Sequence, residues 1–106
     1  MVKKILTAAG FIENETFRAT RFVKPPRETY AVYLDPYTRR GADGKNLITE
    51  HTPTIELYSY KPDPDAEARV EAALDSFALE YEKQECYWIQ EEQLYQVTYT
   101  FSYIEK

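Results

Sequence analysis

The segment TIELYSYKPDPDAEARVEAAL, residues 54–74, changes from a strand pattern to a helix pattern at Pro62. Before this proline, β-branched and aromatic residues are frequent and every second side chain is alike, which is typical of a half-buried strand. After it, Asp63 suits the N-cap of a helix, and Pro64 suits the first turn, where its missing N–H costs nothing. The buried stripe of that helix is expected to comprise Ala66, Val70, Ala73, Leu74 and Phe77. The segment therefore predicts a strand that leads directly into an amphipathic helix.

The residues before this segment predict a helix, an arm and a hairpin. Residues 2–9 place apolar side chains at helical spacing, and Gly10 suits a left-handed cap at the end of that helix. Residues 13–28 are expected to form an irregular arm. TYAVYLD, residues 29–35, alternates like a strand, and Asp43-Gly44 favours a turn. A second strand is expected over residues 47–60, disturbed at Pro53.

The residues after it predict a second hairpin. The first arm is expected over residues 87–89, and the turn over residues 91–93, EEQ. The second arm is expected over residues 94–106, LYQVTYTFSYIEK. Alternation in the last arm is strong, so one of its faces is expected to be covered and the other wet. The predicted fold class is a single α+β domain over residues 1–106. It has a small mixed or antiparallel sheet of about four strands with helices on one face, in the order α-β-β-α-β-β.

The composition excludes several classes of protein. A chain of 106 residues suits one domain, and 43% hydrophobic with 29% charged residues fits neither a disordered nor a membrane-spanning chain. No apolar run approaches the about 20 residues needed to cross a bilayer, and the N-terminus lacks a secretory pattern. A net charge of −5 disfavours nucleic-acid binding. The ten tyrosines suit either protein interfaces or plain strands.

The residues that could perform chemistry do not form a recognisable site. His51 is the only histidine, and the adjacent Glu50 would point to the opposite face of a strand, so we expect a histidine held by a hydrogen bond. Cys86, the only cysteine, is expected to be a buried, inert thiol in a reducing compartment. Helix capping explains Asp63 and Asp65. We therefore predict no catalytic, cofactor-binding or metal-binding residues, and no enzyme.

Several stretches of the sequence resemble those of a known protein family. YAVYLD, then IELYSYKPDPDAEARVEAAL, then EQLYQVTYTF, in this order and spacing, are similar to the small tail-terminator and head–tail joining (minor tail) proteins of long-tailed phages and Gram-positive prophages. The resemblance covers about residues 29–104. It implies a homo-oligomeric ring, usually a hexamer, that caps the tail tube and meets the head connector. Such a protein is part of the virion and assembles in the bacterial cytoplasm. Its partners are its own copies, the major tail tube protein and head connector proteins, without cofactor, direct nucleic-acid contact or membrane.

Surface residues of the hairpins are the expected contacts in such an assembly. Arg39, Arg40 and Lys45 put positive charge at the tip of the first hairpin, which is either a solvated loop or a grip on an acidic protein, and less readily on nucleic acid. The full expected interface is Arg39, Arg40, Lys45, Tyr58, Tyr60, Tyr95, Tyr99 and Tyr103. The alternatives are a head-completion or connector-adaptor protein, and a non-viral module that binds a peptide or small ligand. A concave apolar pocket would favour the module, and a flat sheet with exposed edges the ring subunit.

Overall fold

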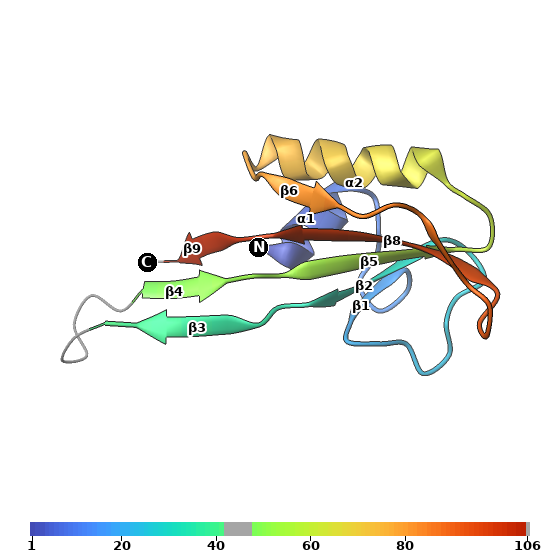
Figure 1. The fold of residues 1–106 in the computed structure, drawn as a ribbon, viewed down its shortest axis with the longest axis horizontal. Helices are drawn as coiled ribbons and strands as arrows, with labels where there is room; N and C mark the ends of the chain where they lie inside the picture. The colour runs from blue at the N-terminus through green and yellow to red at the C-terminus, as the bar shows by residue number, and fades with distance from the viewer. Residues whose placement is uncertain (42–47, 106) are drawn as a thin grey trace.

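The computed structural model describes residues 1–41 and 48–105 as two helices and nine strands in two sheets (Figure 1). The larger sheet has the order β1-β2-β5-β8-β6, with β7 also paired to β8. Its strands are β1 (Phe17–Ala19), β2 (Tyr30–Leu34), β5 (Thr54–Ser59), β6 (Tyr81–Lys83), β7 (Tyr87–Ile89) and β8 (Leu94–Phe101). The smaller sheet has the order β3 (Tyr37–Arg40), β4 (Ile48–His51) and β9 (Tyr103–Glu105).

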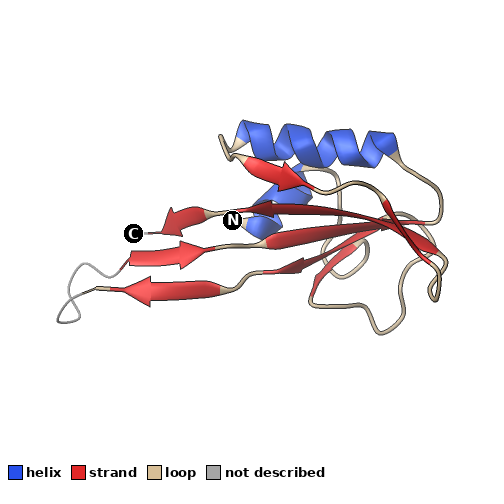
Figure 2. Cartoon of the chain, viewed as in Figure 1, coloured by secondary structure: helices blue, strands red, loops and turns tan. Residues whose placement is uncertain are grey.

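The helices are α1 (Val2–Ala8) and α2 (Pro64–Ser76). They lie beside the larger sheet, and the smaller sheet consists of strands alone (Figure 2). We call the larger sheet with its helices the body, and the smaller sheet the extension. Together they give the molecule a longest dimension of 50 Å. Neither helix in the described residues is long and apolar enough to span a membrane.

The fold class predicted from the sequence is wrong. The described residues form a mostly β domain with nine strands in two sheets, rather than an α+β domain with about four strands in the order α-β-β-α-β-β. Three long strands are each interrupted where the body meets the extension, at Pro36, Pro53 and Ser102. Because proline has no backbone N–H, two of these strands lose a donor at the junction. The carbonyls of Pro36 and Pro53 still accept hydrogen bonds there, from the Thr52 and Phe101 N–H groups. The irregular arm also contributes β1, which pairs in parallel with β2.

One face of the larger sheet and both helices share the main core. Ala31, Leu57 and Val97 are aligned across β2, β5 and β8, and all are buried. Val70 of α2 and Ile5 of α1 are fully buried in the same cluster. Burying each side chain of this size stabilises the fold by about 1.5–3 kcal/mol. The predicted alternation of the last strand is confirmed, since its odd-numbered residues 97, 99 and 101 are buried and residues 96, 98 and 100 are only half-buried.

The start of α2 confirms the predicted cap. The Asp63 carboxylate accepts a hydrogen bond from the Ala66 N–H at 3.1 Å, and Pro64 is the first helical residue. The second carboxylate oxygen of Asp63 accepts the Thr29 hydroxyl at 2.6 Å. One side chain therefore both begins the helix and fixes it to the chain just before β2.

The end of α1 confirms the predicted glycine cap. Gly10 has φ +96°, and the next residue, Phe11, donates its N–H to the carbonyl of Leu6 at 3.0 Å. This is the glycine-terminated cap in which a left-handed residue satisfies the last carbonyls of a helix. Arg69 of α2 adds a hydrogen bond to the Ala9 carbonyl at 2.8 Å. The two helices are thus joined at this end.

Candidate interaction surface

The extension exposes several apolar side chains, although the start of α1 and Phe77 at the end of α2 border it beside Tyr103 and Ile104. All four residues of β3 are exposed, including Tyr37. Ile104 on β9 is 56% exposed, and Ile48 at the start of β4 is exposed as well. A small sheet usually buries one face against another layer, and exposed apolar patches often mark contact sites. The extension is therefore the first candidate for a surface that binds another protein.

A row of aromatic rings connects the extension to the core. Phe101, at the end of β8, packs near Tyr103 with 6.5 Å between ring centroids. Tyr103 stacks on His51 at 4.4 Å, and His51 lies 5.7 Å from Tyr37. The guanidinium of Arg39 lies 5.5 Å from the centre of the Tyr37 ring. Packing continues without a break from the buried core to the exposed edge strand, so the extension has a defined orientation.

His51 is held between two carboxylates. Its Nδ1 lies 2.9 Å from an oxygen of Asp35, and its Nε2 lies 3.1 Å from an oxygen of Glu105. The hydrogen bond to Asp35 raises the pKa of His51 most, burial opposes this, and the bond to Glu105 raises the pKa further. Both effects of the carboxylates favour the imidazolium form. An imidazolium that donates both N–H groups has no lone pair to accept a proton, so this arrangement stabilises structure.

The prediction that His51 is held by a hydrogen bond is confirmed. The sequence did not identify its partners, because Asp35 lies in the short link between β2 and β3, and Glu105 lies in β9 at the other end of the chain. Tyr37 pairs with His51 across β3 and β4, and Asp35 lies two residues before Tyr37. A correct prediction of this strand pairing would therefore have placed Asp35 near His51. Glu50 is turned away, as predicted, and pairs with Arg40 at 2.8 Å.

The structure places the predicted basic residues on the edge of the extension. Arg39 and Arg40 are exposed on β3, which pairs with β4 on one side and with no other described strand on its outer edge. Lys45 and the predicted Asp43-Gly44 turn lie outside the described residues. The two arginines point to opposite faces because they are neighbours on a strand. Any partner that covers one face of the extension therefore meets one of them.

Most of the predicted tyrosines do not share one surface. Tyr103 belongs to the aromatic row, on the side of the sheet that continues the core face. Tyr58 lies on the opposite face of the body, where its ring stacks on another tyrosine. Tyr60 is exposed beyond the end of β5, and Tyr95 is half-buried against Trp88. They could contact a partner only at separate places.

The prediction that Tyr99 is an interface residue is wrong, because its side chain is 0% exposed. Its hydroxyl donates to a Glu71 carboxylate oxygen at 2.8 Å. Glu71 also pairs with Lys83 at 2.7 Å, and Lys83 reaches Glu67 at 2.8 Å. Burial is the largest cause that raises the pKa of Tyr99, and the bond to Glu71 raises it further. Tyr99 therefore joins α2 to the sheet from inside the core.

The prediction that Cys86 is buried is also wrong. Cys86 is exposed in the gap between β6 and β7, where the edge of the sheet is interrupted. Its neighbourhood still removes some water from the sulfur, and this desolvation raises the pKa of the thiol. Within the described residues, no group of three or more His, Cys, Asp or Glu side chains is arranged to hold a metal ion.

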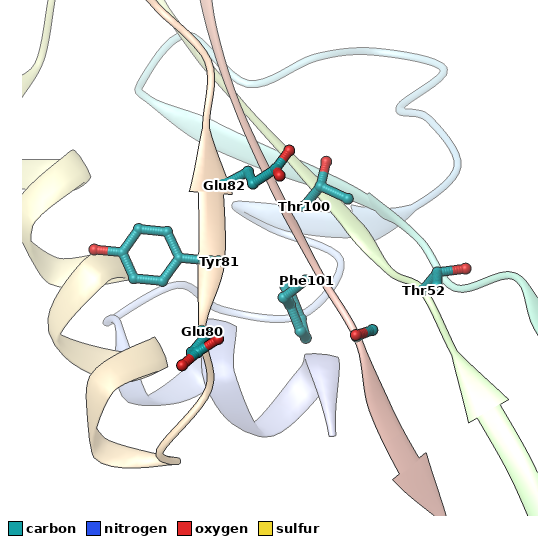
Figure 3. A pocket seen from close by; sticks show the side chains of 7 residues that line it. Thr52, Glu80, Tyr81, Glu82, Thr100 and Phe101 are labelled. Carbon is teal, nitrogen blue, oxygen red and sulfur yellow. The ribbon is translucent and has the colours of Figure 1, made fainter.

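A surface pocket of about 420 Å³ lies where β6 begins and β8 ends (Figure 3). In Figure 3 the Tyr81 ring turns toward α2, and the Glu82 carboxylate lies beside Thr100. The lining residues are Thr52, Glu80, Tyr81, Glu82, Thr100, Phe101 and Ser102. Glu80 and Glu82 are exposed, and neither His51 nor Cys86 lines this pocket. Its lining mixes polar and apolar surface, so it differs from the mostly apolar, concave site that would favour a ligand-binding module.

Comparison of the chain with protein-family models and with curated proteins gives no match.

Proposed function

We propose that this chain is a structural protein of a phage or prophage, which caps the tail tube and joins tail to head as a homo-oligomeric ring. The observation that supports this most is the extension, which exposes Tyr37 on one face and Ile48 and Ile104 on the other. These side chains would lose their contact with water in an assembly, at about 25 cal/mol for each Å² of apolar area removed. An extension fixed by the aromatic row suits a subunit that docks on a preformed partner without rearranging.

The arrangement of the titratable groups also supports a structural role. The imidazole of His51 uses both nitrogens on Asp35 and Glu105, so it is not available as a general base. Lys83 is bound by two carboxylates of α2. His51 and Lys83 therefore stabilise the fold, at the junction of the two sheets and on α2. A catalytic acid or base would instead need a nitrogen that is free to exchange a proton with a substrate.

The free edge of β3 supports one alternative function. An edge strand can accept a peptide as an added strand, which is how many small binding modules work. A head-completion or connector-adaptor protein would use the same surface on a different partner. The tail terminator remains the preferred proposal, because the extension exposes apolar side chains on both of its faces and has an edge strand, more than a single peptide strand would cover.

Deletion of the gene in the phage or prophage that encodes it tests this proposal. A missing cap allows the tube to keep growing, so electron microscopy of lysates should show tails longer than normal and without heads. Free tails of normal length beside defective heads would instead indicate the head-completion role. Normal virions after deletion would overturn both.

Complementation with Arg39→Glu and Arg40→Glu together then tests the extension. The double variant should fold normally, because exposed ion pairs contribute about 0–1 kcal/mol, but it should fail to restore joining. Lys61→Glu is the control, since this residue is exposed beyond the end of β5 that faces away from the extension. Full joining by the double variant would remove both arginines from the proposed contact.

A further inference from the structure

One edge of the body is basic. Residues 18–27, RATRFVKPPR, comprise most of β1 and the chain that follows it, and no acidic residue occurs among them. Three cations on this stretch, Arg18, Arg21 and Lys24, are exposed. A fourth, Arg27, is exposed beyond them and lines a hollow with Glu28 and Asp63 at the end of β5. They form no ion pair with any described residue. We call this surface the basic edge.

The opposite edge of the body is acidic. Residues 80–88 comprise β6, the interruption at Cys86 and the start of β7. Glu80, Glu82 and Glu85 are exposed and take no part in an ion pair within the described part of the chain. The only cation in this segment, Lys83, is already neutralised by two carboxylates of α2. We call this surface the acidic edge.

The two edges cannot meet within one molecule. In the strand order β1-β2-β5-β8-β6 they are separated by three strands, and strands lie about 4.8 Å apart, so about 19 Å lies between β1 and β6. Figure 1 shows β6 and β1 on opposite sides of the body. The two edges therefore cannot match each other's charge within one molecule, whereas a second copy presents both.

Apolar side chains accompany the charges on both edges. Val23 on the basic edge is 76% exposed, and Tyr87 and Trp88 on the acidic edge are 64% and 42% exposed. Aromatic residues surrounded by charge are the usual composition of a protein interface. Pro25 and Pro26 prevent the basic edge from adding a regular strand, so side chains rather than a backbone ladder would make the contact.

We propose that the basic edge of one copy binds the acidic edge of the next copy. This inference rests on the proposed function, because it names the surfaces through which ring subunits meet. The contact joins two different surfaces, and such head-to-tail contacts form rings when their rotation closes. The extension stays outside it and remains free for the tail tube or the connector.

Charge reversal tests the contact on the isolated full chain. Three variants are needed, namely Arg18→Glu with Arg21→Glu and Lys24→Glu, then Glu80→Lys with Glu82→Lys and Glu85→Lys, and finally all six together. Self-association is measured by sedimentation velocity and light scattering, in low salt, up to about 1 mM protein. Wild type should associate, and added salt should weaken this association.

Each triple variant alone should associate at least about tenfold more weakly than wild type, since like charges then face each other. A mixture of the two triple variants should associate again, because one has two acidic edges and the other two basic edges. The variant with all six substitutions should also recover self-association, because its two edges again carry opposite charge. This recovery distinguishes binding between the two edges from a general effect of net charge.

Several outcomes would overturn the contact. A monomeric wild type at low salt and about 1 mM would do so, as would triple variants that associate normally. Failure of the mixture to associate would show that the edges do not bind each other. Circular dichroism checks folding, and glutamine replacements at the same positions take the place of any variant that does not fold. Edge association in a protein whose deletion leaves virions normal would overturn the proposed function but keep this contact.

Discussion

The imidazole of His51 lies flat on the phenol ring of Tyr103, with 4.4 Å between centroids and 3° between planes. The two residues are direct partners in β4 and β9, so the stack follows from strand pairing. Asp35 and Glu105 bind the two nitrogens of the same ring. Stacking and charge together orient the extension at the point where its strands leave the body.

We expect the free energy of unfolding to fall as the pH rises through the raised pKa of His51. Its folded pKa lies above the unfolded value of about 6.5. The stabilisation is therefore complete below the unfolded pKa and is lost as the pH passes the folded pKa. Urea unfolding between about pH 5 and pH 9 measures this in wild type and in His51→Gln. Parallel pH profiles for the two proteins would contradict a charged His51.

Replacing Asp63 with alanine should destabilise the protein by about 1 kcal/mol, because α2 loses its cap. Asp63→Asn is the matched control and should keep most of the stability, since asparagine also caps well. The hydrogen bond from Thr29 is the main cause that lowers the pKa of Asp63. The stabilisation that comes from the ionised Asp63 carboxylate is present above the pKa of Asp63 in the unfolded chain. It is lost as the pH falls through the lower pKa of Asp63 in the folded protein. Denaturation at about pH 7 and about pH 3 separates capping from charge.

Gly10→Ala should cost about 1–2 kcal/mol in unfolding free energy, because φ +96° is a strained conformation for alanine. The added Cβ would also lie 2.7 Å from a terminal nitrogen of the Arg69 side chain. A double-mutant cycle with Arg69→Ala separates the two causes. If the loss disappears in the Arg69→Ala background, the contact dominates, and if it persists, the backbone does.

Tyr99→Phe should lower stability by about 1–2 kcal/mol without changing self-association. The loss comes from the hydrogen bond to Glu71, and it stays small because Lys83 still pairs with that carboxylate. Thermal unfolding measures the first effect, and sedimentation of the variant measures the second. A change in association at full stability would restore Tyr99 as an interface residue.

Cys86 should react with a thiol reagent in the folded protein, because it is exposed. The reaction should be slower than that of a free thiol at the same pH, since the raised pKa of Cys86 lowers its thiolate fraction. Cys86 lies within the acidic edge, so labelling should slow further at protein concentrations where copies associate. An unchanged rate across that range would place Cys86 outside the contact.

Local signals in the sequence were sufficient for several elements. Pro62, Asp63 and Pro64 marked the strand end and the helix start, and the alternation of residues 94–101 showed which side chains share a face. The turn before β8 was also located correctly, although it lacks glycine, because Gln93 adopts φ +54° in its place. These features depend on neighbours in the chain, which is why pattern analysis finds them.

The remainder depends on pairing between distant segments. β1 has three residues and pairs in parallel with β2, so no tight turn announces it. The sequence shows that Pro36 and Pro53 interrupt two strands. It does not show that these interruptions are aligned side by side in the fold, and only this alignment makes them the boundary between two sheets. Asp35 and Glu105 meet at His51 through β3, β4 and β9, and no local pattern records that meeting. Tyr99 was misassigned because alternation identifies a face without stating which face is covered.

Three backbone segments pass from the body into the extension, and all of them run along the longest axis of the molecule (Figure 1). A pull along that axis loads the three covalent backbones in parallel and shears the hydrogen bonds between strands together, whereas a sideways pull would peel them apart one by one. The subunit should therefore be mechanically strongest lengthwise, the direction in which a coupling between two larger bodies is stretched.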